Sequence, residues 1–134
     1  MRIECGADFN IKRHINADRL AEKIRDWYTE QIDDRKFYVT RSDYSDCDGG
    51  RVNYYRIKSR KLMIPKTYAE VRYIQEHHRR IADIEDETLR RKVIDSYYRM
   101  VKIDIRRLHG DVKSQMKALK GTIDDYMSSQ LQTK

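Results

Sequence analysis

The chain has 134 residues, which is enough for one domain with a modest hydrophobic core. Charged residues make up 38% of it and its mean hydropathy is −0.94, so we expect much exposed surface and no membrane-spanning segment. Two cysteines and no apolar leader indicate a cytoplasmic location, the cytoplasm of an infected host included. The formal net charge of +7 favours acidic partners, with nucleic acid the commonest.

The positive charge is concentrated in the middle of the chain. Residues 1–50 carry 9 Lys and Arg against 11 Asp and Glu, whereas residues 51–66 carry 6 against none. Residues 67–134 carry 14 against 11. A binding surface for an anionic partner is therefore expected near the central segment.

The first half of the chain has the patterns of strands and one helix. Residues 2–12 alternate between apolar and polar side chains, as in a half-buried strand. Asn16 suits the N-cap of a helix over residues 17–32. Residues 36–44 and 51–64 are rich in strand formers and are separated by a turn-forming segment, which predicts a β-hairpin.

The second half has helical spacings. Thr67 and Glu70 match a capping box after the single proline, and they predict a helix over residues 67–84. A second apolar repeat keeps helical phase from about residue 89 to about residue 128, across both glycines of this stretch. The sequence therefore predicts a long C-terminal helical hairpin.

The two predicted helices differ in length, so part of the longer one needs another partner. The shorter helix can cover only about half of the longer one. The apolar seam between residues 108 and 127 must then pack on the sheet or on another chain, and the second packing would make it an oligomer interface. The seam residues are Leu108, Val112, Leu119, Ile123 and Tyr126.

Six cations on the predicted long helix form a first candidate surface. On a helical wheel they fall within about 60° of one another, as a ridge that could follow a phosphate backbone. The alternative is that these long side chains only flank the apolar seam and cover it with their stems. The six are Arg99, Lys102, Arg106, Lys113, Lys117 and Lys120.

The second strand of the predicted hairpin carries the other candidate surface. No acid occurs between Asp48 and Glu70, and alternation puts Tyr54 on the same face as three cations. Such a face can contact phosphates and stack a base, although it could equally be a solvated face that protects a sheet edge. The candidate residues are Arg51, Tyr54, Arg56, Lys58, Arg60 and Lys61.

Signatures of catalysis or metal binding are missing from the sequence. It has no Gly-rich phosphate loop, nucleophile elbow, metalloprotease motif or zinc spacing. Asp43, Asp46 and Asp48 surround a turn, but an EF-hand alignment there places tyrosines at two ligand positions. We therefore expect no metal, no cofactor and no enzymatic activity; a nuclease site assembled from scattered residues is the alternative.

Together the patterns predict an α+β fold in a single domain over residues 1–134. Residues 1–66 are expected to form a small antiparallel sheet, made of the N-terminal strand plus the hairpin, with one amphipathic helix. Residues 67–134 are expected to form the helical hairpin.

The expected function is that of a non-catalytic binding module. The basic strand and the basic helix ridge would contact nucleic acid, an acidic protein surface, or the nucleic-acid-binding site of a larger complex. One alternative is a stoichiometric inhibitor or adaptor of phage or plasmid type that docks on a host nuclease or CRISPR complex. Another is an oligomeric structural or assembly protein, such as a homodimer.

Overall fold

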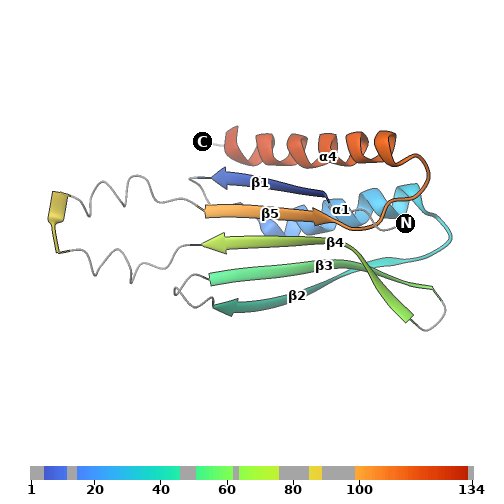
Figure 1. Cartoon of the computed structure of the whole chain (residues 1–134), viewed down its shortest axis with the longest axis horizontal. Coiled ribbons are helices and arrows are strands. Elements are labelled where there is room, and N and C mark those ends of the chain that lie inside the picture. The colour runs from blue at the N-terminus through green and yellow to red at the C-terminus, as the bar shows by residue number, and fades with distance from the viewer. Residues whose placement is uncertain are drawn as a thin grey trace.

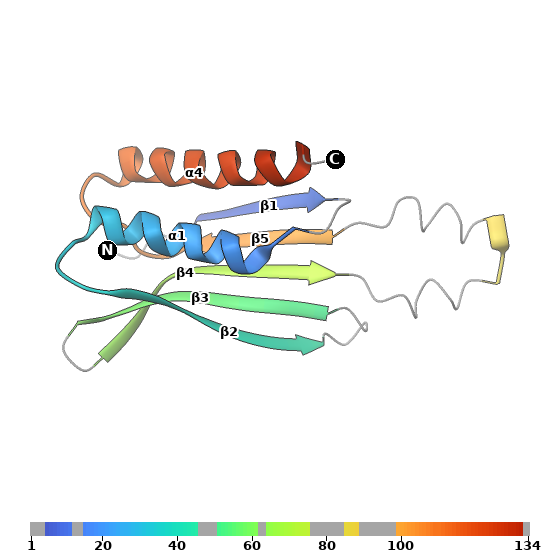
Figure 2. The same ribbon diagram turned by 180° about the vertical axis from the view of Figure 1, so that it is seen from behind.

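The computed structural model of the chain shows a sheet with two helices, seen from opposite sides in Figures 1 and 2. The residues that it describes are 5–11, 15–45, 51–61, 64–75, 85–88 and 99–132. The elements follow in the order β1 (Cys5–Ile11), α1 (Ala17–Gln31), β2 (Phe37–Ser45), β3 (Arg51–Lys61), β4 (Ile64–Gln75), β5 (Arg99–Ile105) and α4 (Val112–Gln132). The fold is α+β, as the sequence predicts.

The described strands form one antiparallel five-stranded sheet in the order β1-β5-β4-β3-β2. Strands β2, β3 and β4 follow one another as neighbours, whereas β1 joins the sheet beside the last strand, β5 (Figure 1). The predicted N-terminal strand and the pairing of the two hairpin strands are confirmed. The turn between these hairpin strands, residues 46–50, lies outside the described residues.

Among the described elements, helices cover only one face of the sheet. Helix α1 lies behind the strands in Figure 1 and in front of them in Figure 2, and α4 runs alongside β1 and packs on α1. One cluster of buried side chains joins α1, α4 and the face of the sheet below α1, which we call the covered face. No described helix packs on the opposite face, which we call the open face.

Helix α1 begins where the sequence predicts. Asn16 accepts the backbone N–H of Arg19 through its side-chain oxygen at 3.1 Å, which satisfies a donor that the start of a helix leaves without a partner. Leu20, Ile24 and Tyr28 are fully buried in one stripe along this helix. The predicted helix and its N-cap are confirmed.

The covered face is apolar because alternate residues of each central strand point toward it. Tyr55 and Ile57 of β3 are buried there, as the period-2 pattern predicts. Val71 of β4 and Ile103 of β5 are buried in the same cluster. The intervening residues of these strands consequently belong to the open face.

The helix predicted for residues 67–84 is wrong where the structure describes it. Residues Ile64–Gln75 form strand β4, and residues 76–84 lie outside the described part of the chain. Thr67 and Glu70 therefore do not cap a helix, because both lie within a strand.

A β-bulge explains why the strand period of this segment is hidden. The pairing register shifts by one residue between Ile57 and Lys58 of β3, which leaves Tyr68 as an extra residue on β4. Tyr68 and the next residue, Ala69, are both buried. Two consecutive buried residues break the alternation, so the segment mimics the spacing of an amphipathic helix.

The long helix predicted for residues 89–128 is wrong over its middle. Residues Arg99–Ile105 form strand β5, α4 begins only at Val112, and residues 89–98 lie outside the described part. The described chain thus has one C-terminal helix in place of the predicted helical hairpin. The residues of β5 that face the core occur at every second position: Val101, Ile103 and Ile105.

The turn before α4 separates this helix from the strand. Gly110 lies in that turn with φ of +82°, a backbone conformation that favours glycine.

In the part of the chain that the structure describes, neither helix is both long enough and apolar enough to cross a membrane.

The apolar seam of the C-terminal segment packs within the chain. Leu119, Ile123 and Tyr126 are buried in the same cluster as α1 and the covered face. Leu108 packs partly against this cluster, and Val112 is half-buried. Of the two packings that the sequence left open, sheet or another chain, the structure shows packing within the chain for Leu119, Ile123 and Tyr126.

We expect Leu119→Ala to lower the free energy of unfolding by about 2–5 kcal/mol, because it leaves a cavity between α4 and the rest of the core. The matched control is Lys120→Ala on the exposed side of the same helix, which should change stability by less than about 0.5 kcal/mol. Urea unfolding followed by circular dichroism measures both. Equal stability of the two variants would contradict the packing of α4 described above.

Candidate functional site

The basic strand predicted from the sequence lies on the open face. Tyr54, Arg56 and Lys58 of β3 alternate with buried residues of the covered face. Arg60 continues the series toward the end of the strand, and the side chain of Lys61 lies outside the described part. The central residues of the predicted surface therefore share one side of the sheet.

Strand pairing brings further cations beside β3. Tyr54 lies opposite Arg72 of β4, which in turn lies opposite Lys102 of β5. Arg106 follows β5 and donates a hydrogen bond to Glu70 of β4 at 3.2 Å. The open face is thus basic across three neighbouring strands rather than along one.

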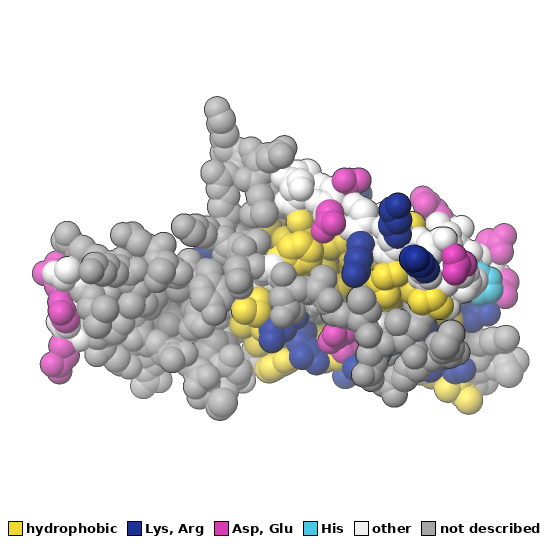
Figure 3. All heavy atoms as spheres, turned by 45° about the horizontal axis from the view of Figure 1, so that its top comes forward, with side chains coloured by type: hydrophobic (Ala, Val, Ile, Leu, Met, Phe, Trp, Pro, Cys, Tyr) yellow, Lys and Arg dark blue, Asp and Glu magenta, His cyan; other side chains and the backbone are white. Residues whose placement is uncertain are grey.

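The six cations of the predicted helix ridge do not form a ridge. Lys102 and Arg106 belong to the open face, whereas Arg99 has the opposite phase on β5. The other three are exposed on α4, which flanks β1 at the edge of the sheet: Lys113, Lys117 and Lys120. Figure 3 shows basic side chains over α4 and further basic side chains below them, with apolar side chains between the two groups.

One buried carboxylate holds the arginines of the open face together. The Glu70 side chain is only 6% exposed and forms its shortest ion pair with Arg106, at 3.2 Å. Arg56 and Arg72 each have a side-chain nitrogen 3.9 Å from a Glu70 oxygen. The guanidinium side chains of these three arginines remain 47%, 38% and 30% exposed for Arg56, Arg72 and Arg106. Three positive charges therefore converge on one negative charge and still face the solvent.

Tyr54 supports two of the same arginines. The guanidinium carbons of Arg56 and Arg72 lie 4.8 and 5.3 Å from the centre of its ring, which is the range of cation–π interactions. Arg56 also donates from Nε to the Tyr54 hydroxyl oxygen at 3.1 Å. This hydrogen bond, followed by the other charge interactions with Tyr54 and Glu70, raises the pKa of Arg56, so its guanidinium stays charged.

The β-bulge fixes the position of the chain just after β5. The carbonyl oxygen of Tyr68 accepts the backbone N–H groups of Arg106 at 2.8 Å and of Arg107 at 3.1 Å. The Tyr28 hydroxyl donates to the carbonyl oxygen of Arg107 at 2.7 Å, and burial raises the pKa of Tyr28, which keeps this donor protonated. Arg106 and Arg107 are consequently anchored to β4 and α1 through their backbone.

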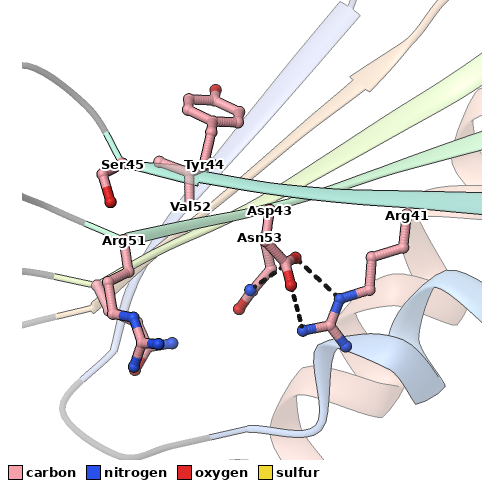
Figure 4. A pocket seen from close by; sticks show the side chains of 8 residues that line it. Arg41, Asp43, Tyr44, Ser45, Arg51, Val52 and Asn53 are labelled. Carbon is pink, nitrogen blue, oxygen red and sulfur yellow. Dashed lines mark hydrogen bonds and ion pairs between the residues drawn. The ribbon is translucent and has the colours of Figure 1, made fainter.

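A separate polar pocket lies at the end of the β2–β3 hairpin (Figure 4). Arg41 forms ion pairs with Asp43 at 2.9 Å and with Asp18 at 2.8 Å, and Asn53 donates to Asp43 at 3.0 Å. The hydrogen bonds from Arg41 and then Asn53 lower the pKa of Asp43. The candidate residue Arg51 lines this pocket and not the open face. The carboxylate of Asp43 is thus already bound by its neighbours.

A cluster of three His, Cys, Asp or Glu side chains suited to a metal ion is not found among the residues that the structure describes. The other two aspartates considered as calcium ligands, Asp46 and Asp48, lie outside them. The open face itself presents guanidinium and ammonium groups, which can bind anions, together with tyrosine rings.

Two residues that organise this surface were missed in the sequence. The sequence pattern predicts that Glu70 belongs to a capping box and Arg72 to a helix, because the bulge at Tyr68 hides the strand period. The usable signal was the short alternation of charged residues with Ala69, Val71 and Tyr73, which are buried on the covered face.

Comparison with known proteins identified no relative of this chain. The chain matches no protein-family model, and no curated protein or solved structure is significantly similar to it.

We expect Glu70→Gln to lower the free energy of unfolding by about 1–3 kcal/mol, because three converging guanidiniums lose the charge that balances their repulsion. High salt should reduce the loss, since it screens the remaining like charges. The matched control is Asp26→Asn, which removes a carboxylate that is 51% exposed and pairs with Arg25; we expect less than about 0.5 kcal/mol there.

Denaturant unfolding at low and high salt measures these differences. If Glu70→Gln proves as stable as Asp26→Asn at low salt, then Glu70 does not organise the arginines of the open face.

Proposed function

We propose that this protein is a non-catalytic module that binds single-stranded nucleic acid on the open face of its sheet. The observation that carries the proposal is the convergence of Arg56, Arg72 and Arg106 on the single carboxylate of Glu70, which leaves an excess of positive charge at the surface. Cations held in fixed positions can replace the counterions of a phosphate backbone, and the released counterions favour binding.

Further cations extend this charge along the face. Lys58 and Arg60 of β3 and Lys102 of β5 have no carboxylate within ion-pair distance among the described residues. Two further acids have open-face positions in the strand pairing: Asp104 of β5, opposite Glu70, and Asp8 of β1, opposite Lys102. Described cations on this face still outnumber its acids. The balance of charge therefore favours an anionic partner over a neutral one.

The aromatic residues of β2 and β3 favour a single strand over a duplex. Tyr44 is 46% exposed and contacts Tyr54, with 6.4 Å between the ring centres. Tyr38 shares this face, because it lies opposite Lys58 in the pairing of β2 with β3. Tyrosine rings and guanidinium planes can stack with unpaired bases, whereas the bases of a duplex are already stacked on one another.

Two variants that reverse the same number of charges distinguish the open face from the exposed lysines of α4 as the binding surface. The triple variant Lys58→Glu, Arg60→Glu, Lys102→Glu reverses cations of the open face and leaves the Glu70 network in place. It should weaken the binding of single-stranded DNA and RNA oligomers by at least about tenfold. The slope of log affinity against log salt should also fall by about 0.7 for each phosphate that the variant no longer neutralises. Fluorescence anisotropy over a series of salt concentrations measures both quantities.

The control is a second triple variant with the same change in net charge, in which Lys113, Lys117 and Lys120 of α4 become Glu. We expect it to bind nearly as the wild type does. If the α4 variant loses the affinity and the open-face variant keeps it, the helix is the binding surface. A wild type that binds oligomers weakly at every salt concentration refutes the proposal, and a partner captured after nuclease digestion would then favour a protein-docking function.

A further inference from the structure

A pocket opens on the sheet beside the bulge, between β3, β4 and the segment after β5. It has a volume of about 520 Å³ and is separate from the hairpin pocket of Figure 4. Most of its lining residues are cationic or can donate a hydrogen bond. They are Arg56, Pro65, Lys66, Thr67, Glu70, Arg106 and Arg107.

Part of this pocket is held in place before any ligand arrives. Glu70 fixes the guanidinium of Arg106 at 3.2 Å and attracts that of Arg56 at 3.9 Å. The carbonyl of Tyr68 fixes the backbone of Arg106 and Arg107, as described above. Because the fold fixes the guanidinium of Arg106 and the backbone at Arg106 and Arg107, an anion that enters the pocket does not have to order these groups, and this favours its binding.

The composition of the pocket suits a phosphate group. A guanidinium presents N–H donors in a planar fork that matches the oxygens of a phosphate, and Arg106 uses one terminal nitrogen for Glu70. The Thr67 side chain is half-buried and can donate a hydrogen bond, and Lys66 is exposed and can contribute charge. Glu70 is the one acid of the lining, and its carboxylate is engaged by arginines.

We infer that the pocket lined by Arg56, Lys66, Thr67, Arg106 and Arg107 is a phosphate-binding subsite of the open face. The inference rests on the proposed function, because it assigns one phosphate of the bound strand to a particular place. That phosphate is either an internal phosphodiester or the phosphate monoester at the end of a strand. The two sources share the chemistry of the subsite and differ in charge.

The first experiment uses inorganic phosphate as the probe, independently of any oligomer. Phosphate is titrated into the full-length protein at constant ionic strength, and binding is followed by ³¹P NMR line broadening. The pocket variant is Lys66→Gln with Arg107→Gln, which leaves the residues paired with Glu70 unchanged. It should bind phosphate at least about tenfold more weakly than the wild type. Its control, Lys113→Gln with Lys117→Gln on α4, removes the same charge and should bind as the wild type does.

Equal phosphate affinity of the two variants, or no phosphate binding by the wild type, overturns the subsite. In the second case the nucleic-acid proposal still depends on its own oligomer titration. Phosphate binding that needs the pocket, together with no oligomer binding, leaves the subsite in place and refutes the proposed function instead.

Oligomers with and without a 5′-phosphate distinguish the two sources of the phosphate. If the 5′-phosphate strengthens binding to the wild type and not to the pocket variant, the subsite takes the end of a strand. If both oligomers bind the wild type equally and the pocket variant weakens both, the subsite takes an internal phosphodiester. If the pocket variant binds both oligomers as the wild type does, the inference is wrong.

Discussion

The carboxylate of Glu70 is the interaction on which the surface of this protein depends. Three arginines come from different parts of the sheet, and each would repel the other two if it faced them without a counter-charge. Burying the carboxylate costs desolvation energy, so the network is not best understood as a source of stability. Its effect is to set the positions of the arginines: the buried carboxylate of Glu70 attracts three guanidinium groups, which remain at the surface. The open face thereby keeps a net positive charge in a defined arrangement.

The fold produces this arrangement through two long-range features. Antiparallel pairing of β5 with β4 places Lys102 beside Arg72, although the two strands are separated by more than twenty residues in the chain. The bulge at Tyr68 then provides a carbonyl that holds the backbone after β5. Helices α1 and α4 contribute by covering the opposite face, so that alternate residues of the strands divide into an apolar core and a basic surface. Core packing and surface charge are therefore two consequences of the same strand period.

The sequence predicted the parts of this structure that depend on local patterns. The N-cap at Asn16 follows from the residue types that cap helices. The hairpin, and the placement of Tyr54 and Tyr55 on opposite faces of the sheet, follow from alternation over a few residues. In the second half, the predicted helix is confirmed from Val112 onward, whereas the helices predicted over β4 and β5 are wrong. In β4 the bulge hides the strand period. Ile103 is buried in β5 but falls outside the apolar stripe of the predicted helix, and this was the residue that contradicted the helix. Arg72 and Lys102 lie beside the basic strand because distant segments of the chain pair in the sheet. A local sequence pattern does not predict such pairing.

The most direct test of the account is to map the contact of a single-stranded oligomer on the protein by amide chemical shifts. The account predicts that the shifts concentrate in the middle of β3, at Glu70 and Arg72 of β4, and from Lys102 to Arg107, and that they lessen as salt is raised. It predicts that the amides of α4 around Lys113 and Lys117 stay nearly unchanged. Shifts confined to α4, or spread evenly over the molecule, would contradict the claim that the charge gathered around Glu70 forms the binding surface.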